Sequence, residues 1–157
     1  MKIHRILIGI DDSRFSDNAA GYGFDIARIY GAEVGLVNII EPIIFPSSSA
    51  DTITGAGFET TGVPDTELIN AQTESAENIL EHIAKKFAGE LKVTPFTDYG
   101  STADGILNCS KEFNADLIVI GTHSRTGLDR LLMGSIAEHV VRHADVPVLV
   151  VPLREES

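Results

Sequence analysis

The sequence predicts an α/β protein with a single doubly wound, five-stranded parallel sheet and helices on both faces. Short apolar segments alternate with longer segments of helical periodicity along the whole chain. The apolar segments are continuously apolar, which is typical of strands that are buried on both faces of a parallel sheet. Because 157 residues most commonly form one domain with its own core, we expect residues 1–157 to be a single domain.

The first part of the chain predicts two strands, one helix and a long loop. Residues 5–10 and 33–40 are apolar runs that are typical of buried strands. Between them, residues 19–30 place apolar side chains at helical spacing, and Gly31 follows as a typical helix end. Residues 41–64 contain prolines, glycines and three consecutive serines, so we expect a long flexible loop there.

Residues 66–87 predict the longest helix, because apolar side chains recur there at positions i, i+3, i+4 and i+7. This apolar stripe consists of Ala76, Ile79, Leu80, Ile83, Ala84 and Phe87. A third strand is expected at residues 91–97. The pattern Ser101-x-x-Asp104 then predicts a third helix with Ser101 as its N-cap.

The last part of the chain predicts two strands around a fourth helix. Residues 116–120 form the fourth strand, and the last strand runs from Val146 to Val151. Between them, the pattern Ser135-x-x-Glu138 is typical of a capping box, so the fourth helix should have Ser135 as its N-cap.

A doubly wound sheet of this size commonly has the strand order 3-2-1-4-5, which we expect here, or the related flavodoxin-like order. In both, ligands bind beyond the carboxyl ends of the strands, where the winding direction switches. Asp11 follows the first strand and Gly121 follows the fourth. We therefore expect these two residues to converge on one crevice.

The charge and composition of the chain argue against several classes of binding partner. The net charge of -11 argues against a general nucleic-acid binder, which would need a basic face, and against docking on anionic membranes. No apolar run approaches the roughly 20 residues that span a bilayer, so we expect no membrane insertion. The N-terminus has no signal-peptide pattern, and the single cysteine, Cys109, allows no intrachain disulfide. A cytoplasmic setting is expected.

Residues 121–135, which read G-T-H-S-R-T-G-L-D-R-L-L-M-G-S, are the most informative segment. They join an apolar strand to the start of a helix, and such loops present backbone N–H groups and a positive helix end to an anion. Gly121 and Gly134 would allow the backbone to approach a phosphate, and Ser135 adds a hydroxyl donor. The alternative is an ordinary connection that leads into a well-capped helix.

Two charged side chains extend this hypothesis. The Asp11 carboxylate, at the end of the first strand, can accept hydrogen bonds from ribose hydroxyls, although a turn residue or helix cap suits aspartate equally well. Arg125, inside the glycine-bearing segment, can pair with a phosphate through its planar guanidinium. No His, Cys and carboxylate cluster has metal-ligand spacing, and the pair His139 and His143 is expected on a solvated helix face.

The segments R-I-L-I-G-I-D-D-S, G-T-H-S-R-T-G-L, L-L-M-G-S-I-A-E-H-V and A-D-V-P-V-L-V-V-P together resemble the universal stress protein family. Its nucleotide-binding signature usually reads Gly-x2-Gly-x9-Gly-Ser/Thr. This chain has the same spacing from Gly121 to Ser135, with Ser124 in place of the second glycine. It resembles the ATP-binding branch with one substitution. If that position needs a left-handed backbone, serine costs on the order of 1 kcal/mol, whereas if the backbone must touch the ligand, its Cβ would obstruct binding.

The resemblance implies an adenine-nucleotide-binding stress or signalling module that binds ATP. It implies a contact from Asp11 to the ribose and an adenine pocket at Ile39, and Mg²⁺ would arrive with the triphosphate, held mainly by phosphate oxygens. It also implies homodimers, which in the family often pair their last strands, here from Val146 to Val151. The expected nucleotide-binding residues are Asp11, Ile39, Ile120, Gly121, Ser124, Arg125, Gly134 and Ser135.

Three alternatives stay open. A slow ATPase or phosphotransferase is one, although the sequence has no Walker A lysine and no recognisable general base. A nucleotide-free dimeric scaffold would result if Ser124 closes the phosphate site. A phospho-acceptor receiver domain would use Asp11 and Asp12 with an acceptor near Asp98, but it also needs a lysine after the fifth strand, where Pro152 stands.

Overall fold

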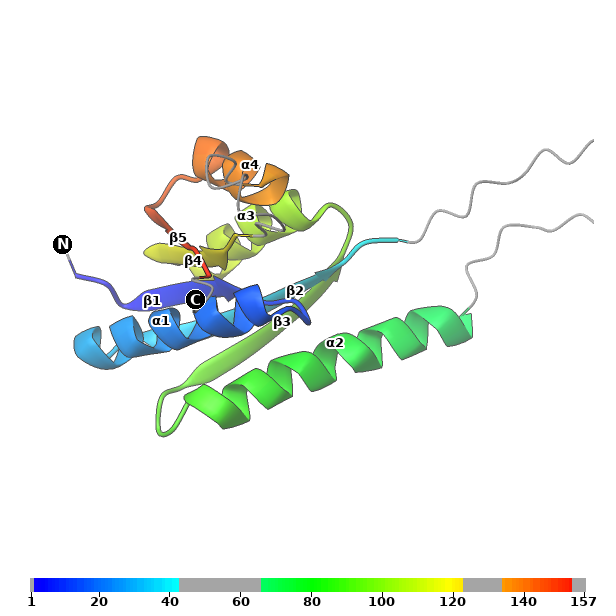
Figure 1. Cartoon of the computed structure of the whole chain (residues 1–157), viewed down its shortest axis with the longest axis horizontal. Helices are drawn as coiled ribbons and strands as arrows, with labels where there is room; N and C mark the ends of the chain where they lie inside the picture. Colours follow the sequence, from blue (N-terminus) through cyan, green and yellow to red (C-terminus); the bar gives the residue numbers. More distant parts are fainter. Residues whose placement is uncertain (1, 43–65, 123–133, 154–157) are drawn as a thin grey trace, which may run out of the picture.

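The computed structural model describes residues 2–42, 66–122 and 134–153, and these form a three-layer α/β structure (Figure 1). All five strands are parallel and have the order β3-β2-β1-β4-β5, as the sequence predicts. The elements are β1 (Arg5–Gly9), α1 (Arg14–Tyr30), β2 (Glu33–Ile40), α2 (Thr66–Phe87), β3 (Val93–Tyr99), α3 (Thr102–Phe113), β4 (Leu117–Gly121), α4 (Ser135–His143) and β5 (Val148–Val151).

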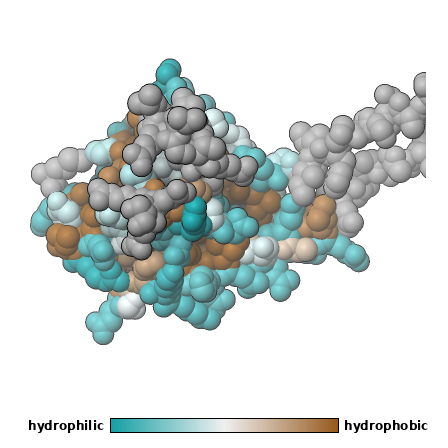
Figure 2. Space-filling model, in the orientation of Figure 1, coloured by the Kyte–Doolittle hydropathy of each residue, from teal (hydrophilic) through white to brown (hydrophobic). Residues whose placement is uncertain are grey.

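Helices cover both faces of the sheet, with α1 and α2 on one face and α3 and α4 on the other (Figure 1). The central strand β1 is apolar throughout because its side chains alternate between two cores. Ile6 and Ile8 pack under α1 and α2, whereas Leu7 packs on the α3 and α4 side. The outer sides of the helices carry mostly hydrophilic residues on the face shown in Figure 2, with apolar patches between them.

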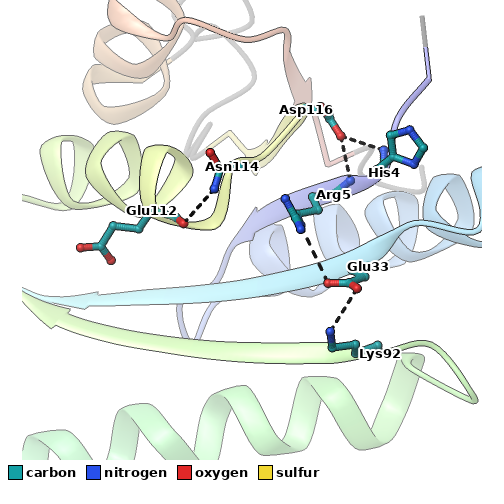
Figure 3. A network of polar contacts seen from close by, with 7 residues as sticks. All are labelled: His4, Arg5, Glu33, Lys92, Glu112, Asn114 and Asp116. Atoms are coloured by element: carbon teal, nitrogen blue, oxygen red, sulfur yellow. Dashed lines mark hydrogen bonds and ion pairs between the residues drawn. The ribbon is translucent and has the colours of Figure 1, made fainter.

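The amino ends of the strands are tied together by polar contacts (Figure 3). The Asp116 carboxylate accepts hydrogen bonds from the backbone N–H groups of His4 and Arg5, at 2.7 and 3.0 Å. Glu33 on β2 pairs with Arg5 on β1 at 3.9 Å and with Lys92, which precedes β3, at 3.0 Å. These contacts hold β1 in register with β2 and β4 at the amino ends of the strands, away from their carboxyl ends.

Two of the predicted helix starts are wrong. Helix α1 begins at Arg14 rather than at residue 19, and Ser13 caps it by accepting a hydrogen bond from the Ser16 N–H at 3.3 Å. Helix α4 has Gly134 as its N-cap, so Ser135 is its first residue and the predicted capping box does not form. Instead, the carbonyl oxygen of Gly134 accepts a hydrogen bond from the Glu138 N–H at 3.0 Å.

Other boundaries shift by a few residues. Strand β3 begins and ends two residues later than expected, and β5 begins at Val148 rather than Val146. Ser101 precedes α3 as predicted, but its side chain makes no capping hydrogen bond. The predicted 41–64 loop lies almost wholly outside the described residues.

The observed strand order excludes the flavodoxin-like alternative. In that order the third strand lies beside the first, whereas here β2 separates them. Asp98 therefore pairs in register with Ile39 on the far side of β2, two strands from β1. This position does not suit the receiver-domain hypothesis, which needs an acceptor close to Asp11 and Asp12.

None of the helices in the described ranges has both the length and the apolar composition that a membrane crossing requires.

Candidate functional site

A cavity of about 440 Å³ lies at the carboxyl ends of β1, β2 and β4, where the winding of the sheet changes direction. Ser124 and Arg125 lie outside the described residues. The other six residues predicted for the site line this one cavity, although they come from four separate segments of the chain: Asp11, Ile39, Ile120, Gly121, Gly134 and Ser135.

The turn after β1 holds Asp11 at the cavity. The backbone N–H of Asp11 donates to Ser16 Oγ at 2.9 Å, and Asp11 Oδ1 accepts from the Ser13 N–H at 2.8 Å. Just before it, the backbone of Ile10 is bonded to β2: its N–H donates to the Val37 carbonyl and its own carbonyl accepts from the Asn38 side chain. The carboxylate is thus positioned by its own turn, and it is chemically able to accept hydroxyl donors from a ligand.

Gly121 and Gly134 are glycines for different structural reasons. A Cβ at residue 121 would lie 2.6 Å from the carbonyl oxygen of Phe15, so this glycine lets β4 pass close to the first turn of α1. Gly134 has a φ of 81°, and a Cβ there would meet nothing within 4 Å among the described residues. Packing alone accounts for the glycine at 121, and the expectation that both glycines allow a ligand to approach stays a prediction.

The N-terminus of α4 forms one end of the cavity. Ser135, Ile136 and Ala137 all contribute to the lining. The first N–H groups of a helix have no partner within the helix, and the helix dipole adds partial positive charge there. This end of the cavity is therefore suited to an anionic group.

The opposite end of the cavity, beside β2, is mostly apolar. Ile39 on β2, together with Val37 and Ile106, lines it. Ile39 packs directly on α3, because a Cβ at Gly105 would lie only 2.5 Å from Ile39 Cδ1. A flat, weakly polar group such as a purine ring would bury apolar surface here.

Sequence reasoning missed three residues around the site: Ser16, Glu41 and Thr102. Ser16 is buried and accepts the Asp11 hydrogen bond, and it belongs to the polar first turn of α1 that periodicity did not reveal. Glu41 lines the cavity, and its carboxylate accepts hydrogen bonds from Thr102. The position of Glu41 directly after a strand was the available signal, as it was for Asp11.

The cysteine and the histidine pair, which are chemically reactive residue types, do not line the cavity. Burial, together with the nearby charges of Glu112 and Asp98, raises the pKa of the Cys109 thiol to about 12, which keeps this buried thiol protonated and unreactive. The rings of His139 and His143 stack 4.3 Å apart, and His139 Nε2 lies 3.0 Å from Asp104 on α3. In the described ranges, no group of three or more histidine, cysteine or acidic residues could hold a metal ion.

Comparisons with known proteins agree on one family. Residues 2–152 match the model of the universal stress protein family. A universal stress protein of Methanocaldococcus jannaschii is 34% identical over 149 residues, which cover 94% of this chain and 81% of that protein.

The fold is shared with solved structures. The structure of a second Methanocaldococcus jannaschii protein, also named a universal stress protein, superimposes with a TM-score of 0.77 at 26% identity and covers 99% of this chain and 100% of its own. A universal stress protein in complex with cAMP superimposes with a TM-score of 0.69 at 21% identity, covering 96% of this chain and 98% of its own.

Proposed function

Because this chain belongs to the universal stress protein family, we propose that it is an adenine-nucleotide-binding module of stress response or signalling that binds ATP. One observation carries the proposal. Residues that the sequence singled out for a nucleotide, taken from the ends of β1, β2 and β4 and the start of α4, line one cavity at the switch point of the sheet. A family member of similar fold has been solved in complex with cAMP, which is an adenine nucleotide.

The lining of the cavity suggests one orientation for the nucleotide. The adenine lies at the apolar end beside Ile39, the ribose hydroxyls donate to the Asp11 carboxylate, and the phosphates lie at Gly134 and the N-terminus of α4. Ser135 supplies a hydroxyl to the phosphates. By their place in the sequence signature, Ser124 and Arg125 belong to the same phosphate end. Mg²⁺ would accompany a triphosphate mainly through phosphate oxygens.

The proposal includes a homodimer that pairs through β5. This strand lies at the edge of the sheet, and among the described strands it pairs with β4 alone. Helix α1 flanks it: the Asn18 side chain donates to the carbonyl of Pro152 just after β5. Tyr22 and Ile29 follow Asn18 on the same helix side, at i+4 and i+11, and they are 56% and 79% exposed. A second copy would bury both the strand edge and these side chains.

The first test is to denature the purified protein, identify any released nucleotide by chromatography, and titrate the protein with ATP and Mg²⁺ in a calorimeter. We expect ATP either to be released or to bind in the titration. If neither occurs, the nucleotide function is wrong and the nucleotide-free dimeric scaffold becomes the better hypothesis.

An Asp11→Asn variant tests the orientation of the ligand. Asparagine keeps an oxygen that can accept the Ser13 hydrogen bond, but it removes the charge that the ribose would meet. We expect ATP binding to weaken by about 1 to 3 kcal/mol. Inorganic tripolyphosphate has no ribose and serves as the control. An equal loss of tripolyphosphate affinity would contradict the ribose contact.

A further inference from the structure

Glu41 stands at the apolar end of the cavity, and its carboxylate is oriented by a specific partner. Glu41 Oε1 accepts two hydrogen bonds from Thr102, one from the hydroxyl at 2.7 Å and one from the backbone N–H at 3.3 Å. Thr102 is the first residue of α3, so Glu41 satisfies one of the first N–H groups of the helix, which have no partner within the helix. The carboxylate therefore lies on the cavity wall between β2 and α3.

The two oxygens of this carboxylate are not equivalent. The bonds from Thr102 occupy Oε1, whereas no described residue donates to Oε2. A carboxylate oxygen is an acceptor only, so Oε2 can accept a hydrogen bond from a donor group of a ligand in the cavity. With one oxygen occupied, the group suits a single amino group better than the two adjacent N–H donors of guanine, which favour a carboxylate with both oxygens open.

The cavity also has opposite polarity at its two ends. Glu41 follows β2, whereas Gly134 and Ser135 lie at the N-terminus of α4, which follows β4. Strand β1 lies between β2 and β4 in the sheet, so these two groups are two strand positions apart. Two strand spacings amount to about 9 to 10 Å, so a carboxylate beside the base does not lie next to the phosphates. A negative end and a positive end would orient a ligand that has an amino group at one end and an anion at the other.

We propose that Glu41 determines the base specificity of the site, by accepting a hydrogen bond at Oε2 from the exocyclic amino group at position 6 of adenine. This inference rests on the nucleotide function proposed above. Glu41 is exposed to solvent, so the expected preference is moderate, about tenfold for ATP over inosine triphosphate, which carries a carbonyl oxygen in place of the amino group.

The Glu41→Gln variant makes the sharper prediction. The backbone N–H of Thr102 can only donate, so the amide oxygen of the glutamine takes the place of Oε1 and its NH₂ group takes the place of Oε2. The NH₂ group of the glutamine then faces the amino group of adenine, which is also a donor, so no hydrogen bond forms. With inosine, the same NH₂ group faces a carbonyl oxygen and can donate to it. We therefore expect the preference to reverse, with inosine triphosphate bound more tightly than ATP. Calorimetric titration of both nucleotides into both proteins measures the ratio.

A Thr102→Val variant is the matched control. It removes the hydroxyl donor to Glu41 but keeps the carboxylate and the backbone N–H, so the preference for ATP should persist even if both affinities fall. An unchanged ratio of the two affinities in Glu41→Gln would overturn the inference while leaving the nucleotide site intact. Equal affinities for both nucleotides in the unaltered protein would do the same. If neither nucleotide binds the unaltered protein, the proposed function fails, and this inference fails with it.

Discussion

The residues at the ends of β1, β2 and β4 each meet a separate structural demand before any ligand is considered. Asp11 accepts a hydrogen bond within its own turn, Glu41 binds the start of α3, and Gly121 lies against the backbone of Phe15. A substitution at such a position can therefore act through the fold as well as through binding. Gly134 is the position where the two effects are easiest to separate, because a Cβ there would meet nothing within 4 Å among the described residues.

A pair of glycine variants tests this separation. Gly134→Val adds a side chain at the cavity that meets no described residue within 4 Å of its Cβ, so the domain should stay folded. ATP binding should be abolished, because the side chain would intrude on the phosphates. The positive φ adds strain of about 1 to 2 kcal/mol, which lowers Tm by a few degrees. Gly121→Ala should lower Tm further, because its Cβ would lie 2.6 Å from the Phe15 oxygen. Thermal unfolding and ATP titration of both variants measure the two effects, and unchanged ATP affinity in Gly134→Val would remove this position from the site.

At the scale of elements, the sequence predicted every strand and helix that the structure describes, because each has an apolar pattern of its own. The helix starts were less predictable. The first turn of α1, from Arg14 to Asn18, is mostly polar, so periodicity gave no sign of it. The partner of Thr102 at the start of α3 is Glu41, 61 residues earlier, and a contact across that separation depends on the tertiary fold.

The candidate site was predictable to a similar degree. Asp11 and Gly121 could be placed together because the carboxyl ends of neighbouring parallel strands meet at one edge of a sheet. The reason for the glycine at 121 could not be inferred, since it depends on how closely α1 approaches β4. The prediction for Ser135 is wrong for a local reason: Gly134, with a φ of 81°, is the N-cap, so the helix starts one residue earlier than it would with Ser135 as its cap.

Helix α3 carries a pH-dependent prediction through Cys109. Its thiol has a pKa of about 12 in the folded protein against 9.0 as the ordinary value, because burial disfavours the thiolate. The unfolded chain therefore loses this proton first. The contribution to stability is complete below pH 9 and is lost as pH rises from 9 toward 12.

A Cys109→Ala variant isolates that contribution, because every other ionisable group is the same in both proteins. We expect the free energy of unfolding, measured by urea denaturation, to fall more steeply with pH in the unaltered protein than in the variant. Cys109 should also resist a thiol reagent at pH 8 until the protein is unfolded. Equal slopes, or rapid labelling of the folded protein, would contradict a buried protonated thiol.

For the whole molecule, the strand order determines both the cavity and the exposed sheet edge. Because β1 lies in the middle, the chain winds outward in two directions from it, and the crevice opens between β1 and β4. The same order leaves β5 at one edge, with helix α1 beside it. The candidate site and the proposed dimer edge are thus adjacent in the structure, since β4 contributes Ile120 and Gly121 to the cavity and pairs with β5.

Proline at residue 150 tests the proposed dimer without removing an internal hydrogen bond. The carbonyls of Pro147 and Val151 accept hydrogen bonds from Ile118 and Thr122, on the β4 side. Because backbone groups alternate along a strand, the N–H of Val150 points to the open edge. Val150→Pro should therefore block strand pairing between two copies and yield a monomer in sedimentation velocity.

A second variant tests the same proposed interface through side chains of α1. Tyr22→Ser combined with Ile29→Ser leaves β5 unchanged but removes the exposed apolar side chains beside it, so the dimer should dissociate at a higher protein concentration than in the unaltered protein. If Val150→Pro remains dimeric, pairing through β5 is wrong.

If Val150→Pro is monomeric, an ATP titration of that monomer shows whether nucleotide affinity depends on the partner. Since the cavity is lined within one chain, we expect ATP affinity to change less than threefold.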